Sequence, residues 1–183
     1  MIYIYMVRFS HGRKSKKFRG GLRTDEEVAW HNIAMQLNIA VKNNDLEKVK
    51  AFLSVPLQDG GLNPNILTRV SASDPPTIKY TPLFLAVINN NLDIVKVLLE
   101  KGADANMPNT TDGPTPVCVA AAFKGHLDVL KLLLANGADP NQARTSDGTT
   151  PVFVAAEVGH LDILKVLLAN GADPNQARTT DGA

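Results

Sequence analysis

The feature that most constrains the fold of this chain is an internal repeat. Residues 127–148 and 161–182 match at 19 of 22 positions, and the three differences are conservative. An earlier and more divergent copy begins at Leu92. A glycine closes the apolar part of each copy at intervals of 35 and then 34 residues, at Gly102, Gly137 and Gly171. Self-similarity at this period predicts stacked supersecondary units that contact mainly their neighbours.

Each unit carries start and stop signals for two helices. The first helix is expected to be capped by a threonine and to begin with a proline. Proline is favoured at the first helical position because an N–H there would have no partner inside the helix. These pairs are Thr81-Pro82, Thr115-Pro116 and Thr150-Pro151. The helix should end near a residue that tolerates the left-handed conformation, at Asn90, Gly125 and Gly159. A second, amphipathic helix should begin at Leu92, Leu127 and Leu161 and end at the repeated glycines.

The units resemble ankyrin repeats. Thr-Pro, Ala-Ala-x-x-Gly-His-Leu-Asp, Leu-Leu and Gly-Ala-Asp-x-Asn recur in order and in register over about residues 80–183. The resemblance implies an all-α ankyrin-repeat solenoid of stacked helix-turn-helix units with β-turn finger loops. The histidine that usually follows Thr-Pro-Leu in this family is replaced by apolar residues, at Phe84, Cys118 and Phe153. A one-residue insertion at Ala122 is expected to bulge or lengthen the first helix of its unit and to displace Phe123 or Lys124 towards the open face.

The chain divides into a tail and a repeat domain. Residues 1–23 form a basic tail that we expect to be disordered, and residues 24–183 form the ankyrin-repeat domain. The domain consists of a cap repeat with an enlarged loop followed by three repeats, with bounds at 24–79 and at about 80–113, 114–148 and 149–183. The enlarged loop contains Ser71–Pro76, which should be mobile or form a special binding loop, with mobility favoured.

The small net charge of +1 hides an asymmetry between these two parts. The tail holds seven basic residues and no acidic one, so the rest of the chain is acidic on balance. The basic run could serve nuclear import, nucleic-acid contact or contact with an anionic membrane. The alternative is a solvated tail, which the lack of periodicity favours. The residues of the run are Arg13, Lys14, Lys16, Lys17 and Arg19.

Catalytic signatures are absent from the sequence. It lacks the phosphate-loop, dinucleotide-binding, zinc-protease and nucleophile-elbow motifs. His126 and His160 occupy the Gly-His position between two helices, where a structural role is favoured. Cys118, the single cysteine, stands where its sister copies have phenylalanine, so we expect a small buried apolar residue. We therefore predict a protein that is not an enzyme and that holds no cofactor and no metal.

The predicted function is binding of a partner protein whose identity is unknown. The resemblance to ankyrin proteins places the partner on the concave face made by the finger loops and the first helices. The candidate contact residues are Ile88, Asn89, Asn109, Thr110, Thr111, Pro114, Phe123, Lys124, Arg144, Thr145, Ser146, Thr149, Glu157 and Val158. Among these, Phe123, Lys124 and Arg144 are the preferred anchors.

Several alternatives stay open from the sequence. The repeats could be a targeting or regulatory region of a larger enzyme, including an exported effector, or the basic tail could contact nucleic acid or membrane. The outer face of the last helix pair is as apolar as an internal one, so it should self-associate, continue into further repeats or be covered by a partner. No apolar run is long enough to span a bilayer, and a single cysteine fits a reducing compartment. The expected location is the cytoplasm, with the nucleus or leaderless export as alternatives.

Overall fold

The computed structural model describes residues 25–55, 61–68, 79–110 and 113–176, and for residues 25–30 it describes the backbone. Within these ranges the chain forms helices and no strand, apart from one isolated β-bridge. The helices come in pairs: α2 (Asp25–Lys42) with α3 (Leu46–Phe52), α4 (Pro82–Ile88) with α5 (Leu92–Glu100), α6 (Pro116–Ala122) with α7 (Leu127–Ala135), and α8 (Pro151–Glu157) with α9 (Leu161–Ala169). This arrangement confirms the predicted all-α repeat solenoid.

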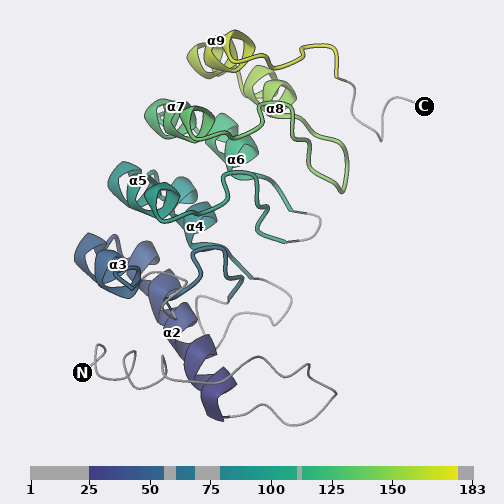
Figure 1. Cartoon of the computed structure of the whole chain (residues 1–183). Helices are drawn as coiled ribbons and strands as arrows, with labels where there is room; N and C mark the ends of the chain where they lie inside the picture. The colour runs from purple at the N-terminus through teal and green to yellow at the C-terminus, as the bar shows by residue number, and fades with distance from the viewer. Residues whose placement is uncertain (1–24, 56–60, 69–78, 111–112, 177–183) are drawn as a thin grey trace.

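The pairs stack into two layers. The first helices of the pairs lie in one layer, the second helices lie in the other, and the connecting loops project from the side of the first layer (Figure 1). Leucine, valine and alanine fill the space between the layers, with Ile94, Leu98, Leu130 and Leu133 fully buried. Because every pair packs on the next, the core is a continuous column.

The threonine caps form as the sequence predicts. The side-chain oxygen of Thr81 accepts a hydrogen bond from the backbone N–H of Phe84 at 3.1 Å. Thr115 and Thr150 make the equivalent bonds at 3.2 Å. Each cap satisfies one of the N–H groups that have no partner inside the helix. The first helices therefore begin at the proline that follows each capping threonine.

The helix ends are also as predicted, with one exception. Asn90, Gly125 and Gly159 adopt the predicted positive φ, with values of 55°, 98° and 73°. After α4 and α8 the chain closes with a backbone hydrogen bond that spans the turn, such as the 2.9 Å bond from the His160 N–H to the Ala155 carbonyl. This is the pattern of a helix that ends in a left-handed residue.

The exception is the turn after α6, which carries the one-residue insertion. Of the two outcomes expected for the insertion, a bulge or a longer helix, the longer helix does not occur, because α6 has seven residues, as α4 and α8 do. The extra residue lies in the turn, where Phe123 is extended (φ −115°, ψ 126°) instead of helical. The His126 N–H bonds to the Phe123 carbonyl at 3.3 Å in place of the longer-range bond seen in the sister turns. Phe123 is displaced to the surface, as the sequence predicts.

Asparagine side chains join successive finger loops. The amide nitrogen of Asn106 donates to the Gly137 carbonyl at 3.0 Å, and its oxygen accepts from the Asp139 N–H at 2.7 Å. Asn65 and Asn141 make the same pair of bonds to the unit that follows each of them. Each asparagine thus satisfies both a donor and an acceptor of its neighbour, which fixes the register between units.

A buried asparagine clamps the first loop to α2. Thr68 and Tyr80 form an antiparallel bridge with backbone bonds of 3.1 and 2.8 Å. The Asn38 amide nitrogen donates to the Thr68 side-chain oxygen at 2.8 Å and lies 3.3 and 3.0 Å from the carbonyl oxygens of Thr68 and Tyr80. The segment Ser71–Pro76, predicted to be mobile or to form a special binding loop, lies outside the described residues. The residues before and after the enlarged loop, Thr68 and Tyr80, are held together by the bridge.

The asparagine bridge predicts a specific stability difference. Asn106→Ala removes two hydrogen bonds between units and should lower the free energy of unfolding by about 1–3 kcal/mol. Asn175 holds the same position in the last unit; its backbone N–H donates to the Asp173 carboxylate, but its side-chain amide bonds to none of the described residues. Asn175→Ala should therefore change stability by less than about 0.5 kcal/mol in the same urea titration. Equal losses in the two variants would contradict a bridging role.

The clamp predicts a larger effect. Asn38→Asp replaces the donating side-chain nitrogen of Asn38 with an acceptor that faces three oxygens, in a fully buried position. It should destabilise the chain by at least about 2 kcal/mol in urea unfolding followed by circular dichroism. Gln36→Glu, an exposed change of the same kind on α2, is the control and should be near neutral. A neutral Asn38→Asp variant would show that the clamp adds nothing.

Candidate partner-binding surface

The candidate contact residues fall on two separate edges of the stack. One edge holds the turns between the two helices of each pair, and we call it the turn edge. The other holds the loops that lead into the next first helix, and we call it the finger edge. A first helix of seven residues with a rise of about 1.5 Å per residue separates the two edges by about 10 Å.

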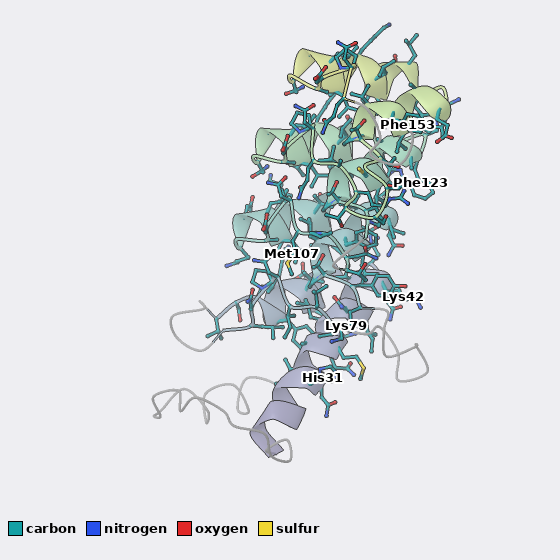
Figure 2. The ribbon with its side chains drawn as sticks, turned by 90° about the vertical axis from the view of Figure 1, so that its right-hand side faces the viewer. His31, Lys42, Lys79, Met107, Phe123 and Phe153 are labelled. Atoms are coloured by element: carbon teal, nitrogen blue, oxygen red, sulfur yellow. The ribbon has the colours of Figure 1, made fainter. Side chains whose placement is uncertain are left out.

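The turn edge and the finger edge divide the candidates by position. The turn edge carries Ile88, Asn89, Phe123, Lys124, Glu157 and Val158, and all of them are exposed. The finger edge carries Asn109, Thr110, Pro114, Arg144, Thr145, Ser146 and Thr149. Thr111 and the basic residues of the tail lie outside the described residues. In Figure 2, Lys42 and Phe123, which stand at the ends of α2 and α6, lie along one side of the stack, whereas Met107 from a finger loop lies away from it.

The first helices α4 and α6 offer little surface between the two edges. The residues of α4 from Pro82 to Val87 are all buried, and so are those of α6 from Pro116 to Ala121. The expected contact surface along the first helices is therefore reduced to their ends. Phe84, one of the apolar residues at the position of the usual histidine, is itself buried within this layer.

The turn edge is the apolar edge. The described residues include six exposed large hydrophobic side chains, and five of them lie here. Their exposed fractions are 37% for Ile88, 42% for Leu92, 47% for Phe123, 45% for Val158 and 59% for Leu161. Sequence reasoning does not single out Leu92 and Leu161, because each begins an amphipathic helix whose apolar residues are expected to pack inward. Their position beside the turn was the signal that could have identified them.

Hydrogen bonds make the turn edge a connected surface. The His126 ring donates from Nε2 to the Ile88 carbonyl at 3.2 Å, and the His160 ring donates from Nδ1 to the Ala121 carbonyl at 3.1 Å. Each histidine thus ties its turn to the first helix of the preceding pair. The Phe123 ring stacks on His126 with centroids 5.2 Å apart. These contacts favour the structural interpretation of both histidines and hold Phe123 in place.

The finger edge is polar and is held by backbone bonds. The Arg144 N–H donates to the Thr149 carbonyl at 2.9 Å, and the Gly148 N–H donates to the Arg144 carbonyl at 2.8 Å. The Arg144 guanidinium lies 3.5 Å from the Asp147 carboxylate, so it is partly committed within its own loop. Thr149 is only 5% exposed, and its side chain is not offered to a partner. The exposed tip of this loop is formed by Thr145 and Ser146.

Cys118 is buried, as the sequence predicts. Its thiol points towards the carbonyl oxygens of Gln142 and Thr149, at 3.7 and 3.8 Å. Burial raises the pKa of the Cys118 thiol above its usual value, although hydrogen bonds from Thr115 oppose the shift. The thiolate needed for a nucleophile is therefore disfavoured.

Neither a metal site nor a membrane-spanning helix is found in the part of the chain that the structure describes. No group of three or more histidine, cysteine, aspartate or glutamate side chains there could hold a metal ion. No helix in the same ranges is both long enough and apolar enough to cross a membrane.

Comparison with known proteins identifies the family. The family model for ankyrin repeats in three copies matches residues 37–144 and also 83–178, which together cover more than half of the chain. The putative ankyrin repeat protein FPV240 of fowlpox virus (strain NVSL) is 32% identical over 87 residues. That match covers 48% of this chain and 18% of the viral protein, so the chain spans less than a fifth of that relative. The chain therefore belongs to the ankyrin-repeat family, whose repeats typically act as non-enzymatic modules that mediate protein–protein interaction.

Proposed function

We propose that this chain is a non-enzymatic scaffold that binds a partner protein chiefly through the turn edge, with Phe123 at its centre. The observation that carries the proposal is the alignment of five exposed large hydrophobic side chains along successive turns. Scattered apolar residues are ordinary on protein surfaces, but apolar residues gathered on one edge are typical of an interaction site. The finger edge, with Arg144, Thr145 and Ser146, is the polar part of the same proposal.

The turn edge has the anatomy of an interface. Phe123 is an aromatic anchor whose ring already rests on His126, so a partner loses little by ordering it. Exposed Lys124 and Glu157 stand beside the apolar row and supply a polar rim. Ile88 and Val158 lie in the neighbouring turns and extend the row to both sides of Phe123.

Two other roles were open from the sequence: a targeting or regulatory region of a larger or exported enzyme, and contact with nucleic acid or membrane through Arg13–Arg19. No described residue supports either role. Placement in the cytoplasm stays part of the proposal. It is supported by a buried, free cysteine, which fits a reducing compartment.

The proposal predicts that charges on the turn edge prevent partner capture. The full chain carrying Phe123→Glu and Val158→Glu should lose at least about thirtyfold in affinity for the captured protein, since an interface anchor contributes about 2 kcal/mol or more. The measurement is quantitative affinity capture from a cell extract, followed by titration of each purified partner. Both side chains are exposed, so helical circular dichroism should stay unchanged.

Two matched variants identify which edge is used. Thr145→Glu with Ser146→Glu places the same charges on the finger edge and should weaken binding only modestly. Lys131→Glu, on the exposed side of α7, should have no effect. Capture that survives the turn-edge variant but is lost in the finger-edge variant would move the site to the finger edge. Capture that all three variants retain would reject both edges.

A further inference from the structure

The exposed apolar side chains of the turn edge recur at a regular interval. Ile88, Phe123 and Val158 each lie at the C-terminal end of a first helix, in three successive units. Packed helices lie about 8–10 Å apart, so the three positions span about 20 Å along the edge. The turns touch directly, because the Asn90 side-chain amide donates to the Gly125 carbonyl at 3.2 Å. The turn edge therefore presents a band of apolar positions with one repeat per unit.

This repeat matches the apolar stripe of an α-helix. A helix rises about 1.5 Å per residue, so residues seven apart lie on one side of it at about the spacing of the units. Leu92 and Leu161, which begin α5 and α9, widen the apolar band in the outer turns. The stripe of an amphipathic helix has a similar width, because residues three or four apart share it. A helix of about 15–20 residues would reach all three turns.

The backbone of the turn edge favours a helix over an extended segment. Extended segments bind by pairing their N–H and C=O groups with the exposed edge of a strand. The turns between the described helix pairs hold no strand. The carbonyl oxygens of Ile88 and Ala121 already accept bonds from His126 and His160. An extended segment would bury unpaired backbone groups here, whereas a helix bonds its own.

A row of carboxylates borders the apolar band on the side of the second helices. Asp93, Asp128 and Asp162 are exposed in the first turn of α5, α7 and α9, each one residue after the leucine that begins the helix. Lys131 lies 3.8 Å from Asp128, and an exposed pair of this kind contributes little. These carboxylates are therefore open to a basic partner. We call Asp93, Asp128 and Asp162 the aspartate row.

The other side of the band carries one exposed charge of each sign, Lys124 and Glu157. We propose that the partner's contact segment is a basic amphipathic helix that lies across the turns after α4, α6 and α8, an inference that rests on the function proposed above. Its apolar residues repeat every seven positions and meet the exposed apolar side chains of the turns. Its lysine or arginine residues follow the aspartate row, where complementary charge sets the orientation of the helix and speeds association.

Selection of peptides on the full chain tests the proposal. The probe is a phage-displayed library of random peptides of about 20 residues, which is long enough to reach three turns as a helix. The enriched peptides should carry large apolar residues seven positions apart and a net positive charge. Once purified, they should gain helical circular dichroism on binding. Phe123→Glu with Val158→Glu should weaken each of them at least about thirtyfold.

Charge exchange tests the aspartate row. Asp128→Lys should weaken an enriched basic peptide at least about tenfold, and the milder Asp128→Asn should weaken it less. A peptide whose lysines are replaced by glutamate should bind Asp128→Lys more tightly than it binds the wild type. Glu100→Lys is the matched control, because Glu100 ends the nine-residue α5 and lies far from the turns. It should change affinity by no more than about twofold, since screening is strong beyond about 10 Å.

Enriched peptides that are acidic, or that stay extended when bound, would overturn the proposal. A library that yields no peptide sensitive to Phe123→Glu with Val158→Glu would overturn it as well, and so would equal losses in Asp128→Lys and Glu100→Lys. The function proposed above fails on a different result, which is capture from a cell extract that survives the turn-edge charges. Capture that needs the turn edge, together with peptides that are not basic helices, would remove this inference alone.

Discussion

Packing between neighbouring helix pairs is the interaction on which the whole molecule depends. A pair of seven- and nine-residue helices is too short to be stable alone, because helices of this length are marginal in water without tertiary contacts. Each pair gains stability by burying one face against the pair before it and the other against the pair after it. Polar bridges add register to this packing at both edges. Asparagines such as Asn106 join the finger loops, and His126 and His160 join the turns.

The same constraint explains where the free surface lies. Apolar residues on α4 and α6 are buried by stacking, so little exposed surface remains between the two edges for a partner. The ends of these helices are different, because the chain must reverse there and neighbouring units do not cover the turns. Exposed hydrophobic side chains therefore collect on the turn edge. The inserted residue after α6 adds to this effect, since it moves Phe123 out of the helix and onto the surface.

The end of the stack follows from the same logic. Residues that serve stacking in one unit become surface in the unit that has no described neighbour, although the two sequences are nearly identical. Leu130 is fully buried and Leu164 is partly exposed for this reason alone. Ankyrin-type units therefore provide two kinds of apolar surface, one made by the turns and one made by an unpaired stacking face.

The sequence by itself determined the local structure of this protein. Capping threonines followed by proline, and residues that tolerate positive φ, are local signals, so the starts of α4, α6 and α8 and the positions of their turns could be read from the repeat. The roles of the histidines and the burial of Cys118 followed from the register of the units. Only the tertiary structure decided which apolar residues are exposed, since Leu161 and Leu127 carry the same side chain in the same motif. It also placed the candidate residues on two edges, buried Thr149 and put the insertion in a turn. These outcomes depend on which neighbour covers each side chain and on how a turn closes over an extra residue, and neither is encoded in the pattern of one unit.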